Sequence, residues 1–425
     1  MRIFRSAIAA FVLFRSAAAL GQPVIGSEIV SGSVPARDEL VSIAAPAIAM
    51  ARDTRGTAIA WTARNVMLIN TVYVARIDET GRIVGDVREV PKASAAMLDA
   101  TSPSMSASPT GSGFTLAWLE VSRYGSPILG SPVYCQLDSD LNPSPSRVLT
   151  AAPQDTTDSP VVARSGTSSW IAAAGKVWRV RRDGTVDSPI SSDINTSDMV
   201  ANEDSPVLVS AGRVQLNTFT CSPEPNCKAV GGPFNGFCYD RDSCRIYKYS
   251  SALRLMRLFV VSTITILPFD SFDQPAIQSN GRDILVAWLF GDEQSGGVVT
   301  ATRLDVASLA DFAARVARDQ LFLGKFGPDA GRTRPDIATD GERYVVVWRT
   351  TTATGDHDVV GASIDRSGNV AYMSIATSPV DERDPSVLAV GNGRFLVAYE
   401  KISGGDRRLA GRFIDFEPRR RTVRN

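Results

Sequence analysis

One pattern recurs along the whole chain and limits the folds that it can adopt. A proline that opens an apolar run is followed 13 to 15 residues later by Trp or Tyr, and 16 to 20 residues after that aromatic comes an Asp preceded by an aliphatic residue. The clear copies are Pro46 with Trp61 and Asp78, Pro103 with Trp118 and Asp138, Pro275 with Trp288 and Asp305, Pro335 with Trp348 and Asp365, and Pro385 with Tyr399 and Asp415. Three features repeated in the same order indicate an internal repeat.

The copy between residues 331 and 376 shows what one repeat contains. Short runs rich in β-branched and aromatic residues, such as 344–348 and 359–365, are separated by Gly, Asp and Ser. This composition predicts four antiparallel strands joined by turns. A single sheet of this kind has two apolar faces, so it must stack on neighbouring copies of itself.

Two weaker copies begin at Pro160 and Pro206, where Ser-Pro-Val is kept but the aromatic residue and the Asp are out of register. The repeat prolines then lie 46 to 69 residues apart. Repeats of roughly 40 to 50 residues with four strands each are typical of β-propeller blades. The sequence therefore predicts an all-β fold, a seven-bladed β-propeller with four-stranded antiparallel blades, over residues 21–418.

The last copy is incomplete, and the N-terminus offers the missing part. The copy stops at Asp415, where its third strand is expected to end, and Pro418 with the following Arg run disfavours a fourth strand. The run Val24 to Ser31 ends 15 residues before Pro46, much as the fourth strand of the sixth copy precedes Pro385. We therefore expect the N-terminal strand to complete the last blade and close the ring, which leaves no open sheet edge there.

The first 20 residues predict export. A basic start is followed by the apolar run Ala7 to Phe14 and by Ala17-Ala18-Ala19, which fits a secretory signal peptide. The apolar run is far shorter than the roughly 20 residues that a membrane span needs. We expect a secreted, periplasmic or cell-surface protein with no membrane span.

Charge composition narrows the class of partner. The chain has 45 Lys and Arg against 45 Asp and Glu, so its formal net charge is zero. A nucleic-acid surface needs a net basic stripe, and we therefore expect no nucleic-acid partner. The basic tail, residues 419–425, is expected to be solvated. The expected partner is an extracellular protein or a glycan, and the protein itself is expected to be a monomer.

Cysteine spacing points to a disulfide-bearing insertion at about 221–244. Five, ten and five residues separate Cys221, Cys227, Cys238 and Cys244, in a segment rich in Pro, Gly, Asn and Asp. In an oxidising compartment this pattern favours two disulfides, although it leaves the pairing open. A four-thiolate zinc site is the alternative, but such sites usually keep two to four residues within each pair. Cys135 lies in a strand-like run and is expected to be a buried free thiol.

The residues of the repeat also carry a family resemblance. The runs 335–338, 340–341, 344–348 and 361–368 resemble the repeat of exported bacterial β-propeller proteins of uncharacterised function. This resemblance covers roughly residues 24–417, implies a seven-bladed fold and transfers no catalytic residue. Sialidases have a similar style of blade, but residues 363–368 hold one residue too many for the sialidase Asp-box, and the Arg-Ile-Pro start of sialidases is absent from the mature region.

The expected channel gives the candidate ligand site its geometry. First strands line the channel of a propeller, so residues just before the repeat prolines are expected at its mouth. These residues are Asp158, Asp204, Asp273, Asp384, Arg332 and Arg334. A ring of carboxylates there would suit Ca²⁺ or a cationic ligand. The plainer alternative is that each Asp accepts backbone hydrogen bonds in its turn.

A second, weaker metal candidate is the pair Asp356 and Asp358, which flank the single histidine, His357. Carboxylates so spaced would contact a divalent cation. Gly-Asp recurs at the same loop position as Gly291-Asp292 and Gly405-Asp406, which favours turn chemistry instead.

These observations favour a binding or interaction scaffold over an enzyme. The alternative is a carbohydrate-active hydrolase or lyase that uses carboxylates at the channel mouth, because inverting hydrolysis needs two acids about 6.5–9.5 Å apart. Two carboxylates in one deep pocket, one of them desolvated enough to raise its pKa, would favour the enzyme.

The cysteine pattern yields a direct prediction. The exported protein is expected to show no alkylatable thiol among Cys221, Cys227, Cys238 and Cys244 until it is reduced. Closing a loop of about 15 residues is worth roughly 3 kcal/mol in the chain-entropy model, but here it constrains an insertion rather than the sheets. Mass spectrometry of alkylated protein with and without reductant tests this, and four free thiols or stoichiometric zinc in the unreduced sample would contradict it.

Overall fold

The structure is a computed structural model, and it shows an all-β chain. It describes residues 23–34, 48–64, 69–94, 98–122, 129–150, 154–155, 159–191, 198–202, 205–214, 241–249, 255–265, 271–292, 296–305, 320–327, 334–404 and 406–416. These ranges contain strands β1 to β30 and no helix, so none of them holds a helix able to cross a membrane.

The described strands pair into seven antiparallel sheets, numbered here in chain order from β3 onward. Sheet 1 contains β3 (Ile48–Asp53), β4 (Gly56–Arg64), β5 (Asn70–Ile77) and β6 (Ile83–Glu89). Sheet 2 contains β7 (Leu98–Ala107), β8 (Phe114–Ser122), β9 (Leu129–Leu137) and β10 (Arg147–Val148), and β11 (Gln154–Asp155) also pairs with β9. Sheet 3 contains β12 (Val161–Arg164), β13 (Ser168–Ala173), β14 (Lys176–Arg181) and β15 (Ile190–Ser191).

The remaining sheets follow the same order. Sheet 4 contains β16 (Asp198–Asn202), β17 (Ser205–Val214), β18 (Arg241–Tyr249) and β19 (Leu255–Thr265). Sheet 5 contains β20 (Ser271–Ser279), β21 (Asp283–Asp292), β22 (Gly296–Asp305) and β23 (Gln320–Phe326). Sheet 6 contains β24 (Asp336–Thr339), β25 (Arg343–Thr351), β26 (His357–Asp365) and β27 (Val370–Ala376). Sheet 7 contains β28 (Asp381–Gly391), β29 (Arg394–Ser403) and β30 (Asp406–Asp415), together with β1 (Val24–Ile25) and β2 (Ile29–Val34).

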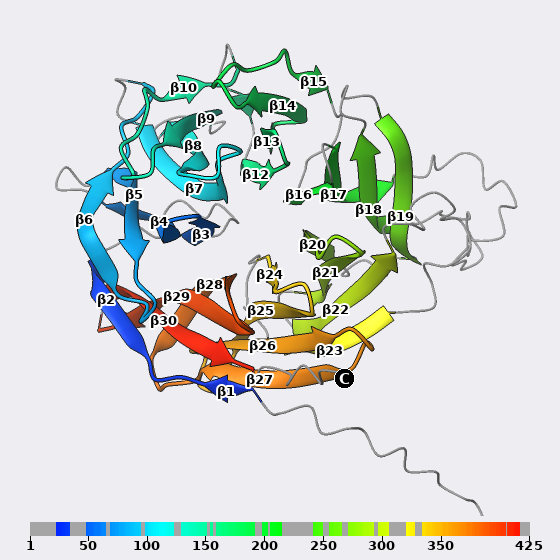
Figure 1. The fold of residues 1–425 in the computed structure, drawn as a ribbon. Helices are drawn as coiled ribbons and strands as arrows, with labels where there is room; N and C mark the ends of the chain where they lie inside the picture. The colour runs from blue at the N-terminus through cyan, green and yellow to red at the C-terminus, as the bar shows by residue number, and fades with distance from the viewer. Residues whose placement is uncertain are drawn as a thin grey trace, which may run out of the picture.

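The sheets stand around a common centre, which is the arrangement of a β-propeller. Figure 1 shows the first strand of each sheet beside the central opening and the later strands toward the rim. Apart from β1, β2 and β11, strands that are neighbours in sequence pair with one another, so each sheet is built on a meander. The predicted all-β fold with four-stranded antiparallel repeats is therefore confirmed.

Apolar residues from neighbouring sheets fill the space between them. One core joins residues of sheets 1 and 2, among them Val72 and Trp118, and another joins sheets 5 and 6, among them Leu323 and Trp348. The repeat aromatics Trp61, Trp118, Trp288, Trp348 and Tyr399 are all at most 6% exposed. The recurring aromatic residue therefore packs between sheets, where its large apolar surface is removed from water.

The N-terminal strand closes the ring as predicted. Val24 pairs with Asp415 in β30, and β2 continues the pairing from Ile29 to Val34. Between these two strands the Glu28 carboxylate accepts hydrogen bonds from Lys401 Nζ at 2.6 Å and from the Tyr399 hydroxyl at 2.9 Å. These donors hold the pKa of Glu28 below its ordinary value against the opposing effect of burial.

The same closing segment also contacts sheet 1. The turn between β5 and β6 holds Gly81 at φ +83°, and a Cβ there would lie 2.5 Å from Cδ1 of Ile29 and 3.2 Å from Cε2 of Phe413. Any larger residue at position 81 would push these side chains apart. The closing strand thus completes sheet 7 and packs on sheet 1.

One repeat boundary was predicted wrongly. Pro206 lies in β17, the second strand of sheet 4, and not in its first strand. The first strand is β16, in which Asp198 and Met199 take the places that Asp336 and Ile337 take in sheet 6. In sheet 6 the partner of Asp336, Val347, is followed by the repeat aromatic Trp348, whereas in sheet 4 the partner of Asp198, Val209, is followed by Ser210. The fourth repeat therefore lacks both its proline and its aromatic residue, which is why the pattern blurs there.

The cysteine prediction is tested only at one position. Cys135 in β9 is free and buried, as predicted, and burial raises the pKa of its thiol to about 12. Cys221, Cys227 and Cys238 lie outside the described residues, and Cys244 lies in β18 with an undescribed side chain. The two disulfides stay a prediction. Residues 1–20 and 419–425 also lie outside the described residues.

Removing the closing strand is expected to destabilise the whole ring. Deletion of residues 22–33 exposes the edge of β30 and removes the partly buried Ile25 and Ile29. Burial of these two side chains contributes roughly 3 kcal/mol or more to the free energy of unfolding. Urea unfolding followed by circular dichroism measures this loss. Val24→Thr is the control, because Val24 is 61% exposed and pairs through its backbone. A deletion variant that unfolds with the full-length protein would contradict the closure.

Candidate functional site: the central channel

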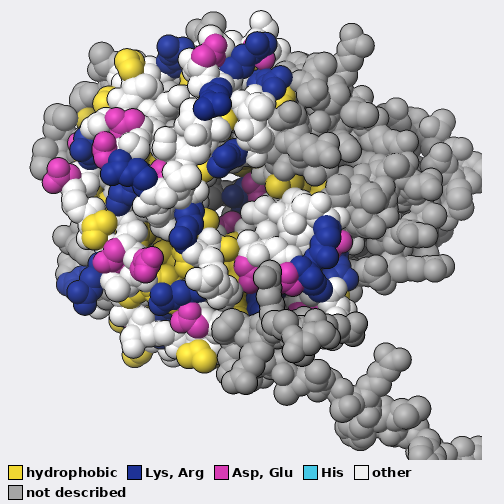
Figure 2. All heavy atoms as spheres, in the orientation of Figure 1, with side chains coloured by type: hydrophobic (Ala, Val, Ile, Leu, Met, Phe, Trp, Pro, Cys, Tyr) yellow, Lys and Arg dark blue, Asp and Glu magenta, His cyan; other side chains and the backbone are white. Residues whose placement is uncertain are grey.

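A cavity lies where the first strands meet. Its volume is about 260 Å³, and residues of β3, β7, β12, β16, β20, β24 and β28 or directly before them line it. The residue two places after each repeat proline, or its equivalent in β16, contributes an apolar side chain: Ile48, Met105, Val162, Met199, Ile277, Ile337 and Val387. Figure 2 shows an opening at the centre of this face, with acidic and basic side chains in and around it.

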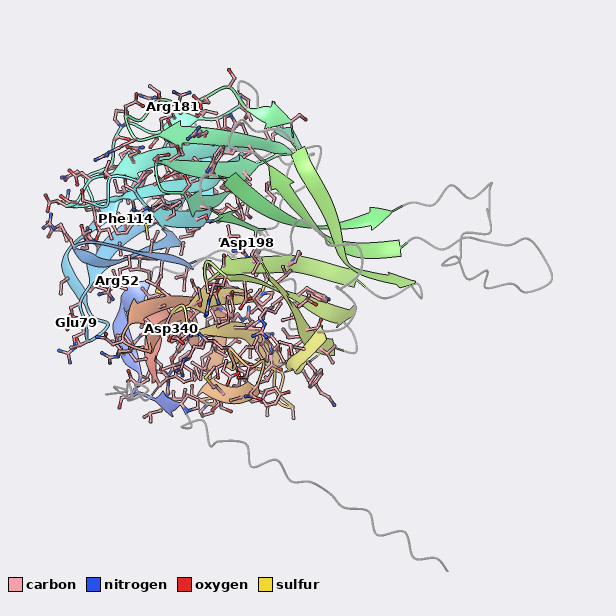
Figure 3. The ribbon with its side chains drawn as sticks, turned by 45° about the vertical axis from the view of Figure 1, so that its right-hand side comes forward. Arg52, Glu79, Phe114, Arg181, Asp198 and Asp340 are labelled. Carbon is pink, nitrogen blue, oxygen red and sulfur yellow. The ribbon has the colours of Figure 1, made fainter. Side chains whose placement is uncertain are left out.

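Charged side chains line the cavity at one side, in sheets 4 and 6. Asp198 of β16 forms an ion pair with Arg334, with 3.1 Å between Oδ1 and Nη1. The two side chains are only 16% and 13% exposed, respectively. Figure 3 places Asp198 near the centre of the ring. Asp336, two residues after Arg334, is the third charged residue in the described lining.

The two carboxylates also join neighbouring sheets. Asp198 Oδ2 accepts a hydrogen bond from the backbone N–H of Ile277 in sheet 5 at 2.9 Å. Asp336 Oδ2 accepts from the N–H of Val387 in sheet 7 at 2.8 Å and from the Ser386 hydroxyl at 2.9 Å. Each bond satisfies a donor on an edge strand that faces the channel. We call this contact the inner-edge bridge.

A hydroxyl makes the same contact between sheets 2 and 3. Ser104 Oγ accepts a hydrogen bond from the N–H of Val162 at 2.9 Å. Ser104, Asp198 and Asp336 occupy the same register position, one residue after the repeat proline or its equivalent. The inner-edge bridge is therefore a property of the repeat and links sheets 2 and 3, 4 and 5, and 6 and 7.

Burial makes Asp198 the most chemically unusual group in the channel. Desolvation raises its pKa above the ordinary value, while Arg334 and the N–H groups of Ile277 and Met199 oppose the rise. The neighbouring Asp336 carboxylate adds to the rise. A carboxyl group with a raised pKa and a second carboxylate in the same cavity can hold or release a proton at a less acidic pH than a solvated aspartate.

The strands bend where they reach the mouth of the channel. Ser102 and Asp384 precede repeat prolines and have positive φ values of 58° and 50°, which are uncommon for residues with a side chain. Both lie at register shifts, between Thr101 and Ser104 in β7 and between Arg383 and Ser386 in β28. Such β-bulges redirect side chains at the ends of strands.

A network of charged residues surrounds the bulge of β28. The His357 ring Nδ1 lies 2.7 Å from Asp381 Oδ1, and Arg383 Nη2 lies 2.6 Å from the other oxygen of Asp381. Arg407 Nη1 contacts both oxygens of Glu400 at 3.1 Å. These acids and bases are paired with one another inside the protein.

Arg349 of β25 joins this network. Burial lowers the pKa of its guanidinium, and the carboxylates of Asp384, Asp381 and Glu400 oppose the change. Glu382, next to Asp381, is fully buried and accepts hydrogen bonds from Ser378, while its burial raises the pKa of the carboxyl group. These ion pairs and hydrogen bonds join the strands of sheets 6 and 7 to one another.

The structure locates only part of the predicted mouth. Arg334 lines the cavity, and Asp384 lies in β28 beside Arg349. Asp273 lies in β20, but its side chain is not described. Asp158, Asp204 and Arg332 lie outside the described residues.

The structure describes the second metal candidate, Asp356 and Asp358, and shows few groups beside them that could bind a metal ion. Thr354 Oγ1 donates to Asp356 Oδ2 at 3.1 Å, and burial together with the Asp356 charge raises the pKa of Asp358. No group of three or more His, Cys, Asp and Glu that could hold a metal ion occurs in the part of the chain that the structure describes.

Asp198 and Asp336 were missed by the sequence reasoning. They lie one residue after the repeat proline or its equivalent, whereas the prediction used the residues before it. The sequence does hold a signal for this register position. A polar residue directly follows the repeat proline in otherwise apolar runs, as Ser104, Asp336 and Ser386 do.

Comparison with known proteins supports the fold and leaves the activity open. No protein-family model matches the sequence, and no curated protein matches it. The chain is similar in structure to a protein of unknown function from Dyadobacter fermentans, with a TM-score of 0.51, 9% identity, and coverage of 94% of this chain and 100% of that chain. At such low identity this similarity shows a shared fold alone.

Weaker structural matches include two further proteins. The phage phi92 endosialidase matches with a TM-score of 0.49 and 10% identity, over 94% of this chain and 70% of that chain. The β-propeller domain of the trilobed protease from Pyrococcus furiosus matches with a TM-score of 0.43 and 11% identity, over 92% and 94%. We base no functional statement on either.

The inner-edge bridge can be tested by removing one acceptor. Asp336→Ala is expected to lower the free energy of unfolding by about 1–3 kcal/mol, because it leaves partly buried N–H and O–H donors unpaired. Asp336→Asn keeps one acceptor and should lose less. Asp183→Ala is the control, since Asp183 caps a solvent-exposed turn and should change stability far less. Urea denaturation measures all three, and equal effects of the two alanine variants would contradict the bridge.

Proposed function

We propose that this protein is an exported, seven-bladed β-propeller that acts as a binding scaffold and holds its ligand in the central channel. The observation that most supports this proposal is the cavity of about 260 Å³, which is lined by residues of all seven described sheets. Ligand sites are usually concave, with polar groups that converge on the ligand. Here the charged residues Asp198, Arg334 and Asp336 converge on the cavity together with several hydroxyl and amide side chains.

The scaffold function agrees with how these groups are bonded. Asp198 accepts from two backbone N–H groups and from Arg334, and Asp336 accepts from two N–H groups and one hydroxyl. Carboxylates held so firmly keep their position when a ligand binds, which lowers the ordering cost of binding. The expected setting is the periplasm, the cell surface or the medium, and the expected partner is a glycan or an extracellular protein.

One observation favours a second candidate, a carbohydrate-active hydrolase or lyase. Asp198 has a raised pKa and shares its cavity with Asp336, which is the combination that acid–base chemistry requires. Its oxygens are nevertheless occupied by three donors, so a proton held there would first have to displace one of them. For this reason we place the scaffold first.

Filling the channel tests the proposed site. Ser159→Phe and Ala389→Phe each add a phenyl ring to the cavity lining and are expected to abolish glycan-array signals given by the mature protein. Val84→Phe is the control, because Val84 lies on β6 at the rim and is 44% exposed. Binding that survives in both channel variants, each shown to be folded by circular dichroism, would place the ligand elsewhere.

The enzyme alternative has a separate readout. A hydrolase or lyase acting through the channel would release new reducing ends from a bound glycan, and Asp198→Asn would stop that release without abolishing binding. A scaffold would bind the glycan and release none. Measuring bound glycan and reducing ends on the same samples separates the two functions.

A further inference from the structure

The charges that face the channel select among ligands. The described lining contains two carboxylates, Asp198 and Asp336, and one guanidinium, Arg334. With both carboxylates ionised, these three groups carry a net charge of −1. In a partly desolvated cavity such a charge favours a cation and disfavours an anion, because the interaction is screened far less than at the surface.

The uncharged side chains that line the cavity indicate which kind of cation would bind there. Hydroxyl and amide groups occur on several sheets, among them those of Ser102, Ser159, Thr339 and Gln278. No aromatic side chain occurs among the described lining residues. Quaternary ammonium groups are recognised by aromatic cages, whereas a primary ammonium group binds through hydrogen bonds that it donates to oxygen. The lining therefore suits a primary ammonium on a hydroxyl-bearing molecule.

The size of the cavity sets a further limit. Ligand pockets for drug-sized molecules span about 300–1,000 Å³, and this cavity, at about 260 Å³, lies just below that range. One ring-sized unit fits the space better than a longer chain does. A sugar ring that carries one amino group has both the hydroxyls and the charge that the lining favours.

We propose that the channel binds the primary ammonium group of an amino sugar, with Asp336 and Asp198 as the counter-charges and Arg334 as the residue that weakens and tunes this attraction. This inference rests on the proposed function, since it names the ligand class of the same site. Asp336 lies in sheet 6 and Asp198 in sheet 4, so an ammonium between them would be held from two sheets.

Four sugars that differ at one group test the ligand class. Glucosamine is the cationic probe, glucose the neutral one, N-acetylglucosamine the one with its amine blocked, and glucuronate the anionic one. Isothermal titration calorimetry at pH 6.5, where the amine of glucosamine is protonated, is expected to give glucosamine the highest affinity, at least about tenfold above glucose, and glucuronate the lowest; a tenfold difference corresponds to 1.4 kcal/mol. Equal or tighter binding of glucuronate or N-acetylglucosamine would overturn the inference.

Arg334 gives the sharper test, because the two possible ligand charges predict opposite signs. Arg334→Gln removes the one positive charge in the described lining and is expected to tighten glucosamine binding, and to do so less as the pH is lowered, because without Arg334 the Asp198 carboxylate protonates more readily. Were the ligand an anion, the same variant would lose binding. Arg181→Gln is the matched control: Arg181 pairs with Asp187 on sheet 3, remote from the centre in Figure 3, and its loss should leave the affinity unchanged.

Acidification supplies an independent readout on the unmodified protein. Protonation of Asp198 removes one negative charge from a lining whose other described charges are Arg334 and Asp336, so glucosamine affinity is expected to fall as the pH is lowered from 6.5, where the amine of the ligand is already protonated. Because burial raises the pKa of Asp198, this fall should begin at a higher pH than for a solvated aspartate. Asp198→Asn should bind glucosamine more weakly and lose this pH dependence, and an unchanged pH profile in that variant would contradict the role of Asp198.

The two levels of proposal fail in different ways. If the channel-filling variants abolish binding of a neutral or acidic sugar, the channel site stands and the amino-sugar inference falls. If no sugar binds, and no array ligand is lost on filling the channel, the channel site itself falls. If glucosamine binds equally to wild type and to both channel-filling variants, its site lies outside the channel, and both proposals are overturned.

Discussion

The structure depends on how the inner edges of its sheets are satisfied. The first strand of each described sheet is an edge strand, so its channel-facing N–H groups lack a partner strand. In three places a side chain one residue after the repeat proline accepts such an N–H from the next sheet: Ser104 from Val162, Asp198 from Ile277 and Asp336 from Val387. A buried donor left unpaired costs about 1–3 kcal/mol, so these inner-edge bridges fix neighbouring sheets at the channel wall.

The same residues therefore hold the ring and shape its channel. The charges of Asp198 and Asp336 are explained by the backbone donors that they bind, without any catalytic role. Their carboxylates nevertheless line the cavity, so in the proposed site they are also the groups that would select the charge of a ligand. A ligand site built in this way is rigid, because moving either carboxylate would break a contact between two sheets. That rigidity is what a binding scaffold needs, and it restricts the motion of a proton-transferring acid.

The repeats could be predicted from the sequence where a large aromatic residue packs between sheets. The parts of the structure that depend on polar contacts could not. Five copies were found because Trp61, Trp118, Trp288, Trp348 and Tyr399 fill the space between sheets. Sheet 4 was misplaced because Ser210 stands where sheet 6 has Trp348, and because β16 has no proline. Asp336 was missed because the candidate residues were those before the repeat prolines and not those after them, and Asp198 because β16 has no proline to mark it. Only the pairing of the strands in the structure shows that the side chains of these two residues accept hydrogen bonds from the next sheet.

Sheet 1 is joined to its neighbours differently from the bridged pairs. On one side Arg76 donates to the carbonyl of Ser139 at 2.8 Å, and the N–H of Gly113 donates to Asp53 at 2.7 Å; these contacts lie at the turns of sheets 1 and 2. On the other side Arg394 donates to the carbonyl of Glu79 at 3.1 Å, and Ile29 of the closing strand packs on Gly81. The first strands of the two sheets also meet, since Arg52 of β3 donates to the carbonyl of Val390 in β28, and apolar residues of both sheets, among them Met50 and Leu396, pack in one core. The closing strand and the turn contacts thus add to a junction that is also joined at its inner strands. Because the N-terminal strand completes sheet 7 and also packs on sheet 1, it stabilises this junction from the rim, far from the channel.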